Sequence, residues 1–181
     1  MKIEKLKFQD FYLIKPALYK DNRGVFYRHF CEKELKKKNI KVSAKQGNIS
    51  ISVKKGTLRG FHYQSKPYTE NKIISVISGS IYNVTIDLRK KSTTFLTKSI
   101  QRINTKNNKL LLIPAGCANA FLTTSKNTII HYYMSSIFEK ENKNKYKGFR
   151  FNDNFFNIKW PNKIKVISKK DKTYKDYNLK V

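Results

Sequence analysis

Short runs of β-branched and aromatic residues, separated by turns, restrict the possible folds of this chain more than any other feature. Two of these runs, Lys72–Ile77 and Ile81–Ile86, flank Ser78-Gly79-Ser80. Glycine can take the positive φ that a tight hairpin requires, so we predict that the two runs are strands joined by a tight turn. Strand composition predicts further strands at Gly47–Val53, Leu58–Tyr63, Thr94–Ile103, Lys109–Ile113, Ala118–Thr123 and Thr128–Met134.

Strands at this spacing, with no long helical period after the first third of the chain, predict an all-β sandwich or barrel. One short helix is expected at Glu32–Lys38, and the segment from Trp160 onward is expected to be irregular and held at the surface by its lysines. The sequence shows no internal repeat and no linker, and 181 residues suit one folding unit. We therefore expect a single domain over residues 1–181.

The net charge of +27 would attract a nucleic acid or an anionic membrane surface. The lysines are, however, spread along the whole chain and mixed with asparagine, in runs such as Asn104–Lys109 and Lys140–Lys145 that are typical of solvated loops. This distribution favours an anionic small ligand over a nucleic acid. No apolar run approaches the ~20 residues of a membrane span, and the first residues lack the apolar stretch of a secretory signal, so we expect a cytoplasmic protein with no membrane partner.

The two cysteines, Cys31 and Cys117, have no CxxC or metal-ligand spacing. We expect both to be buried free thiols in a reducing compartment. A metal is also not expected, because Gln64 stands where an HxH pair would place a second histidine, and His29 and His131 have no partner at ligand spacing.

The segment Leu58-Arg59-Gly60-Phe61-His62-Tyr63-Gln64 places one of only three histidines between a guanidinium and aromatic side chains. A free imidazole has a pKa of about 6.5 and is largely neutral at neutral pH, so it can remove a proton from carbon. A histidine on a strand is more often a packing residue. The neighbouring Arg59 and the motifs below favour a catalytic His62.

Several motifs, taken in order, resemble the dTDP-4-dehydrorhamnose 3,5-epimerase family. They are Asp21-Asn22-Arg23-Gly24-Val25-Phe26, Gln46-Gly47-Asn48-Ile49-Ser50, Arg59–Gln64, Lys72, Ile86–Ser92, Ile113-Pro114-Ala115-Gly116, Phe151-Asn152-Asp153, Trp160-Pro161 and Ser168-Lys169-Lys170-Asp171. The resemblance implies a cupin-like jelly-roll sandwich with short peripheral helices. It also implies a homodimer, and catalysis without metal or dissociable cofactor.

Inverting a sugar carbon next to a ketone requires removing a proton, stabilising the enolate oxygen and returning a proton to the opposite face. The resemblance makes His62 the base, Asp171 the carboxylate that orients it and Lys72 the cation beside the enolate. It makes Tyr132 the proton donor, and Tyr133 should face the other side of the same strand. Without the resemblance, Asp171 would be one acid in a basic tail and Lys72 a solvated lysine.

Nucleotide binding is likewise implied by resemblance, with guanidinium groups suited to diphosphate oxygens. Phe26 could stack on a base or simply pack. The implied substrate-binding positions are Arg23, Phe26, Arg28, Gln46, Asn48, Arg59, Asn119 and Lys170.

Four departures from the family pattern bear on the substrate. Arg28 stands where a glutamate is usual, which makes GDP an alternative to dTDP, since guanine offers acceptors to a guanidinium. Asn119 replaces a usual histidine, as it also does in related GDP-4-keto-heptose epimerases of capsule synthesis, and Asn83 replaces a usual aspartate. The loop Glu139–Lys147 is longer than usual, with no glutamate aligned to the binding one of the family.

The resemblance therefore implies a C3 and/or C5 epimerase of a nucleotide-diphosphate 4-keto sugar, hexose or heptose, in bacterial capsule or lipopolysaccharide synthesis. Three alternatives remain open: a nucleotide-sugar ketoisomerase, a non-catalytic sugar-binding cupin and a nucleic-acid-binding β-barrel.

Overall fold

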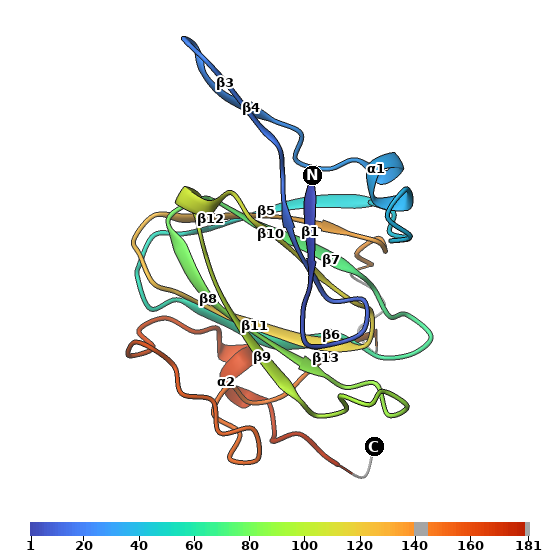
Figure 1. Cartoon of the computed structure of the whole chain (residues 1–181). Helices are drawn as coiled ribbons and strands as arrows, with labels where there is room; N and C mark the ends of the chain where they lie inside the picture. The colour runs from blue at the N-terminus through green and yellow to red at the C-terminus, as the bar shows by residue number, and fades with distance from the viewer. Residues whose placement is uncertain (140–144, 180–181) are drawn as a thin grey trace.

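Two antiparallel sheets face one another in the computed structural model, which describes residues 1–139 and 145–179 (Figure 1). The six-stranded sheet has the order β1 (Lys2–Lys5), β2 (Tyr12–Lys15), β10 (Leu110–Ile113), β7 (Lys72–Ser78), β12 (Thr128–Met134) and β5 (Gln46–Ser52). The five-stranded sheet has the order β13 (Tyr146–Gly148), β6 (Leu58–Gln64), β11 (Cys117–Thr123), β8 (Ser80–Asp87) and β9 (Lys98–Asn104). This arrangement confirms the predicted all-β sandwich.

The remaining elements are short and peripheral. A two-stranded hairpin, β3 (Leu18–Asp21) and β4 (Gly24–Tyr27), extends away from both sheets (Figure 1). The others are helix α1 (Glu32–Lys36), the 3-10 helix η1 (Thr105–Asn107) and helix α2 (Lys169–Thr173). The predicted helix is thus confirmed but ends two residues early, whereas α2, β13 and the four N-terminal strands were not predicted.

The turn at Gly79 is correct, but the predicted hairpin is wrong. Gly79 has φ +80°, and a Cβ there would lie 2.5 Å from Ser125 Oγ, so only glycine fits the turn. The strand β7 that precedes it pairs with β10 and β12, whereas β8 pairs with β11 and β9. The turn therefore carries the chain from one sheet to the other instead of closing a hairpin.

The predicted strand Thr94–Ile103 also begins too early, because β9 starts at Lys98. The hydroxyl groups of Ser92 and Thr94 both donate to Asp87, and these bonds hold the preceding residues in a turn.

The core has a layer between the sheets and a second layer outside the five-stranded sheet. Between the sheets pack residues such as Leu111, Phe121 and Ile130. Phe61 and Phe149 lie in the outer layer, with stacked rings 4.7 Å apart, and Trp160 packs against them. The segment from Trp160 onward is largely irregular with exposed lysines, as expected, but it also packs the partly buried rings of Trp160 and Tyr177 against this layer.

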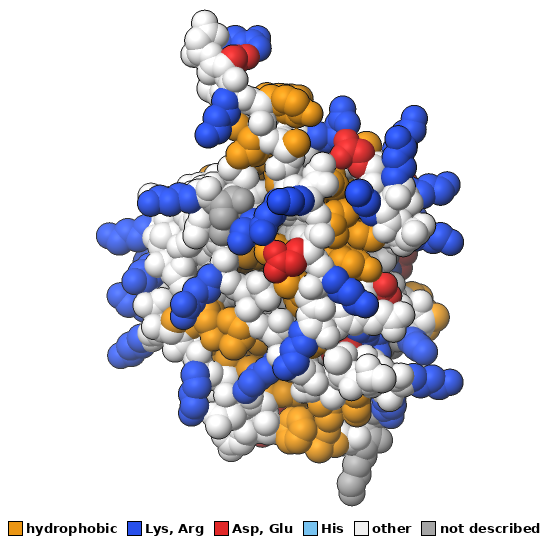
Figure 2. Space-filling model, in the orientation of Figure 1, with side chains coloured by type: hydrophobic (Ala, Val, Ile, Leu, Met, Phe, Trp, Pro, Cys, Tyr) orange, Lys and Arg blue, Asp and Glu red, His pale blue; other side chains and the backbone are white. Residues whose placement is uncertain are grey.

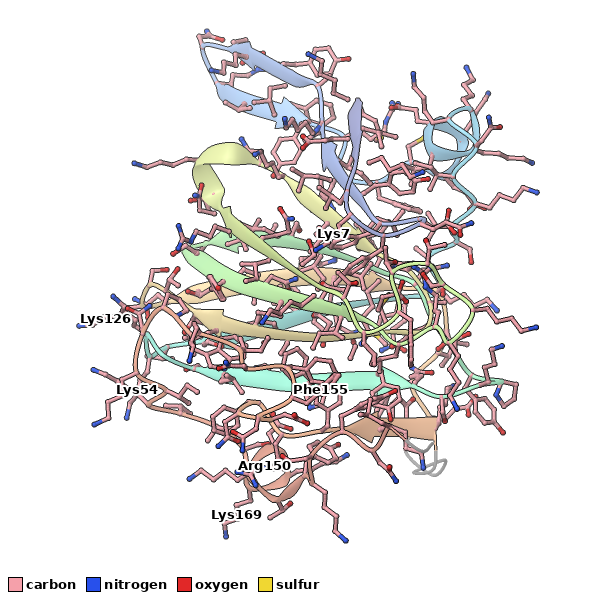
Figure 3. All side chains as sticks on the ribbon, turned by 60° about the horizontal axis from the view of Figure 1, so that its bottom comes forward. Lys7, Lys54, Lys126, Arg150, Phe155 and Lys169 are labelled. Carbon is pink, nitrogen blue, oxygen red and sulfur yellow. The ribbon has the colours of Figure 1, made fainter. Side chains whose placement is uncertain are left out.

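Lysine and arginine side chains are spread over the face seen in Figure 2 and are not gathered into one stripe. Lys54, Lys126 and Lys169 extend outward from the periphery (Figure 3). Lys145 is an exception to the predicted solvated run, since its side chain is 5% exposed and Nζ donates to the Ile137 carbonyl at 3.2 Å. The rest of that run, residues 140–144, lies outside the described residues. No helix in the described ranges is long and apolar enough to cross a membrane.

Both cysteines are free thiols, as expected. Cys117 is buried, and burial is the largest cause that raises its pKa, to about 12. Cys31 is only half-buried, because it precedes α1 at the edge of the fold, so the expectation of two buried thiols is wrong for this residue.

Candidate active site

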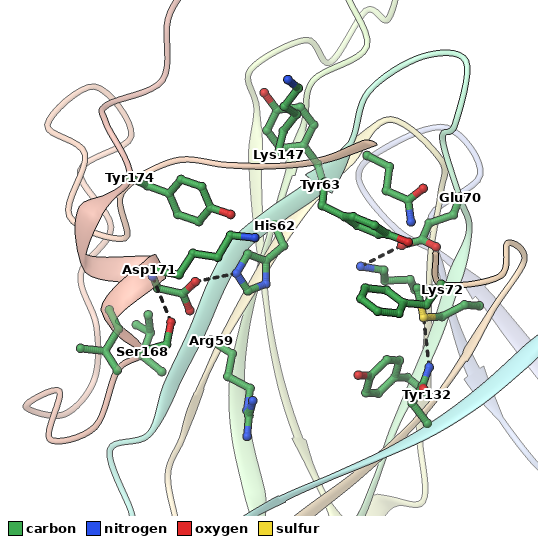
Figure 4. Close-up of a pocket in the computed structure, with 18 of the residues that line it drawn as sticks. Arg59, His62, Tyr63, Glu70, Lys72, Tyr132, Lys147, Ser168, Asp171 and Tyr174 are labelled. Atoms are coloured by element: carbon green, nitrogen blue, oxygen red, sulfur yellow. Dashed lines mark hydrogen bonds and ion pairs between the residues drawn. The ribbon is translucent and has the colours of Figure 1, made fainter. Parts of the chain in front are cut away.

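A cavity of about 700 Å³ lies between the two sheets and brings together all four predicted catalytic side chains. His62 comes from β6 in the five-stranded sheet, and Lys72 and Tyr132 come from β7 and β12 in the six-stranded sheet. Asp171 comes from α2 (Figure 4). A second chamber of about 360 Å³ shares His62, Lys72 and Tyr132 with the first and is also lined by Asn119 and Ser50.

His62 and Asp171 form a hydrogen-bonded pair, with Nε2 of the ring 2.7 Å from Oδ1 of the carboxylate. Helix α2 holds Asp171 in place because Ser168 is its N-cap, with Oγ accepting from the Asp171 backbone N–H at 3.0 Å. The backbone N–H of Gly60 donates to the second carboxylate oxygen at 3.2 Å. Because Nε2 is occupied in this way, Nδ1 is the nitrogen of His62 that is available for proton transfer.

The carboxylate of Asp171 is buried, with 4% of its side chain exposed. Burial by itself raises the pKa of Asp171. The hydrogen bond and charge of His62, with the Gly60 and Ser168 contacts, outweigh burial, so the pKa is lowered overall. Asp171 therefore stays ionised and can stabilise a protonated imidazole.

Gly60 makes this geometry possible. Its φ is +113°, and a Cβ at this position would lie 2.6 Å from the Asn119 carbonyl oxygen of the neighbouring strand β11. Only glycine lets β6 approach β11 this closely while its N–H points to Asp171.

Tyr132 lies on the opposite wall of the cavity from His62 (Figure 4). Burial is the main cause that raises the pKa of its phenol; the nearby Arg59 lowers it and Glu70 adds to the rise. The phenol is therefore protonated at neutral pH and can donate. Tyr133 lies on the other face of the strand against His29 and Phe30, as the alternation of side chains predicted.

Lys72 forms an ion pair that sequence reasoning missed. Its Nζ lies 3.1 Å from Oε1 of Glu70, whose side chain is 4% exposed, and Ser136 Oγ donates to the other oxygen of Glu70 at 3.1 Å. One feature of the sequence could have indicated this pair. Acidic residues are rare, with 12 Asp and Glu against 39 Lys and Arg, and Glu70 stands two positions before the predicted catalytic Lys72.

Five of the predicted binding residues line the two chambers. Gln46 Nε2 donates to Asn48 Oδ1 at 2.9 Å on β5. In the smaller chamber, Asn119 Nδ2 donates to Asn83 Oδ1 at 2.8 Å, so two neutral amides meet in the buried wall of β11 and β8. The five residues are Gln46, Asn48, Arg59, Asn119 and Lys170.

The other three predicted binding residues do not reach the cavity of their own chain. Arg23 pairs with Asp21 at 2.6 Å in the turn of the projecting hairpin, and Phe26 is 71% exposed on β4 (Figure 1). Arg28 pairs with Glu34 at 2.5 Å. In one chain the hairpin carries Arg23 and Phe26 away from both sheets, and Arg28 follows directly after it, so their role in substrate binding stays a prediction.

No group of three or more His, Cys, Asp or Glu that could hold a metal ion exists among residues 1–139 and 145–179. The rings of His29 and His131 do come together, with centroids 5.2 Å apart, outside the cavity. The predicted long loop Glu139–Lys147 falls largely on residues 140–144, outside the described residues.

A β-sandwich whose cavity sets a His–Asp pair opposite a phenol has the base and the acid on facing walls that a carbohydrate epimerase, an isomerase, requires. The model of the dTDP-4-dehydrorhamnose 3,5-epimerase family matches residues 5–178. The chain belongs to this family, as the sequence motifs predicted.

Relatives and solved structures agree with this assignment. The dTDP-4-dehydrorhamnose 3,5-epimerase of Methanothermobacter thermautotrophicus is 34% identical over 90% of this chain and 87% of its own length. The crystal structure of the Bacillus anthracis enzyme with TDP and PPi bound has a TM-score of 0.92 at 33% identity, covering 97% of this chain and 99% of that one. The Legionella pneumophila enzyme in complex with dTDP-4-keto-L-rhamnose has a TM-score of 0.89 at 30% identity, covering 98% and 93%. The neighbours confirm the predicted jelly roll.

Proposed function

We propose that this protein inverts C3 and C5 of a nucleoside-diphosphate 4-keto sugar, in the manner of a dTDP-4-dehydrorhamnose 3,5-epimerase. The observation that carries the proposal is the placement of the His62–Asp171 pair and Tyr132 on facing walls of one cavity. A ring bound between them would meet a base on one face and an acid on the other.

In the proposed mechanism, Nδ1 of His62 takes the proton from the carbon beside the ketone, and Asp171 stabilises the imidazolium that forms. The C–H electron pair becomes the enolate, whose oxygen lies near the ammonium of Lys72. The phenol of Tyr132 then gives its proton to the opposite face, which completes the inversion. Proton exchange with water resets both residues before the next carbon reacts.

The ligands of the neighbours support a dTDP sugar as substrate, since the Bacillus anthracis structure holds TDP and the Legionella pneumophila structure holds dTDP-4-keto-L-rhamnose. Arg59 and Lys170 are the cations of the cavity that suit a diphosphate.

A GDP-4-keto-heptose is the second candidate. The neutral Asn119–Asn83 pair, where a histidine and an aspartate are usual, favours it.

We also propose a homodimer in which the β3–β4 hairpin of one copy completes the cavity of the other. The hairpin projects from its own chain and exposes apolar side chains, Leu18, Tyr19, Val25 and Phe26. Strand β5 is an edge of the six-stranded sheet and exposes Ile49 and Ile51, and Val53, directly after it, is also exposed. Exposed apolar edges of this kind are normally covered by a partner. In this arrangement Arg23 and Phe26 contact the nucleotide bound by the second copy.

The free thiols Cys31 and Cys117 fit a cytoplasmic enzyme. The proposed product supplies a bacterial surface polysaccharide, capsule or lipopolysaccharide.

The experiment that tests the function is incubation in deuterium oxide with dTDP- and GDP-linked 4-keto sugars, followed by NMR of the C3 and C5 protons. Wild type should exchange both protons and form the inverted product. His62→Asn should abolish exchange, whereas Tyr132→Phe should keep exchange at the face of His62 and lose inversion. A 3-keto product would instead identify a ketoisomerase, and no exchange with any of these sugars would refute the proposal.

A further inference from the structure

Gln64 is a buried amide in the cavity that the mechanism above does not use. It ends β6 two residues after His62, and it lines the same cavity. Only 5% of the residue is exposed, and neither Nε2 nor Oε1 has a hydrogen-bond partner within the described ranges 1–139 and 145–179. Buried polar atoms without partners are rare and destabilise a protein, so they commonly mark a functional position.

The surroundings of Gln64 restrict what it can bind. Alternate side chains of a strand share a face, so Gln64 lies roughly 7 Å from His62 along β6. Glu70 and Lys72, which pair with each other, line the same cavity. Because the ammonium of Lys72 is already paired with Glu70, a phosphate would have to compete with this carboxylate for it, whereas a neutral polar group needs no charged partner.

We propose that Gln64 is a further substrate-binding residue, whose amide recognises a hydroxyl group of the sugar. A hydroxyl can accept from Nε2 and donate to Oε1 at once, so it satisfies both orphan atoms, whereas a phosphate oxygen only accepts. The inference rests on the proposed function, since it places the sugar at the His62–Gln64 end of the cavity and leaves the diphosphate to Arg59 and Lys170.

The test uses Gln64→Leu, which keeps the size of the side chain and removes its polar atoms. The melting temperature of the ligand-free variant should equal or exceed that of wild type, because no hydrogen bond is lost. The KM for the 4-keto sugar nucleotide should rise about tenfold, from the loss of one buried pair of hydrogen bonds. Gln101→Leu, on β9 outside the cavity, is the matched control and should leave KM unchanged.

Calorimetry separates this inference from the epimerase function. Gln64→Leu should weaken binding of a dTDP-linked sugar but not of dTDP alone, whether or not the protons exchange. Sugars that lack the C2 or the C3 hydroxyl identify the group concerned, since the analogue without the recognised hydroxyl should bind wild type and Gln64→Leu equally. Equal binding of every sugar by the two proteins, or a lower melting temperature with unchanged kinetics, would overturn the assignment.

Discussion

Asp171 sets which nitrogen of His62 carries a proton. The carboxylate only accepts, so the hydrogen bond from Nε2 keeps Nδ1 free to act as the base. In Asp171→Asn the amide can donate to Nε2, which moves the ring proton to Nδ1 and blocks the base. We expect kcat to fall by about 10²- to 10⁴-fold with KM little changed.

The pH dependence of the free energy of unfolding gives a second measure of the role of Asp171. The pKa of Asp171 is lowered in the folded protein, so its stabilisation is present above the ordinary carboxyl pKa of about 3.9 and is lost as the pH falls through the lowered value. Asp171→Asn removes this acid-side dependence of stability. Asp176→Asn, which replaces an exposed acid beside Arg150, should change neither kcat nor the pH dependence of stability. A normal kcat in Asp171→Asn would show that the pair is only structural.

At the scale of single residues, the sequence alone identified His62 as a candidate, because a histidine beside an arginine in an aromatic strand is unusual. Its partner Asp171 lies 109 residues away, so only the family resemblance could pair them. Glu70 and Gln64 were missed as site residues for a related reason: burial inside a cavity depends on strands that are distant in sequence, and no local pattern reports it.

The loop after β8 is held by one fully buried carboxylate. Asp87 accepts from Arg89 Nε and Nη2, each at 2.8 Å, and from Ser92 Oγ at 2.6 Å and Thr94 Oγ1 at 2.7 Å. Burial is the largest influence on its pKa and raises it, but these donors together outweigh burial and lower the pKa to about 2. Asp87→Asn should reduce the free energy of unfolding by roughly 3 kcal/mol at pH 7, because it breaks a buried ion pair.

The difference between Asp87→Asn and wild type should depend on pH. A depressed carboxyl pKa stabilises the fold above about pH 4, and this stabilisation is lost as the pH falls towards 2. Urea unfolding should therefore show a large gap between the two proteins at pH 7 and a smaller one at pH 3. Asp176→Asn should track wild type at both. A gap of equal size at the two pH values would contradict this account.

At the scale of elements, the positions of the strands could be predicted better than their partners. Strands β7 and β8 are both buried over most of their length, so neither shows the alternation that would reveal which face meets which sheet. The turn residues reveal a turn at Gly79 but not where its strands pair. Strand β3 is exposed at all four residues, so its sequence shows no alternation of buried apolar and exposed polar residues.

For the whole molecule, the net charge of +27 is distributed over the visible surface, whereas the features that point to a partner are apolar. The hairpin β3–β4 projects from the fold, and both it and the edge strand β5 expose large apolar side chains. One chain holds the catalytic side chains in its cavity, but its hairpin carries Arg23 and Phe26 away from that cavity. The proposed homodimer accounts for both facts. Only the family resemblance implied it, because a hairpin that serves another copy has the same local sequence pattern as one that serves its own.

Mixing two inactive variants tests the shared site directly. His62→Asn has an intact hairpin and no base, and Arg23→Ala with Phe26→Ala has the base and a defective hairpin. In a mixed dimer, the site that keeps His62 receives the intact hairpin, so one of its two sites is complete. Random mixing makes half of the dimers mixed, and activity should return to about a quarter of the wild-type value.

The matched control mixes His62→Asn with Tyr132→Phe. Both residues line the cavity of their own chain, so each site still lacks one of them and no activity should return. Sedimentation should give wild type twice the mass of the 21.3 kDa chain. If the first mixture shows only the sum of the separate activities while the proteins are dimeric, the hairpin serves its own chain. If wild type sediments as a single chain, the dimer itself is refuted.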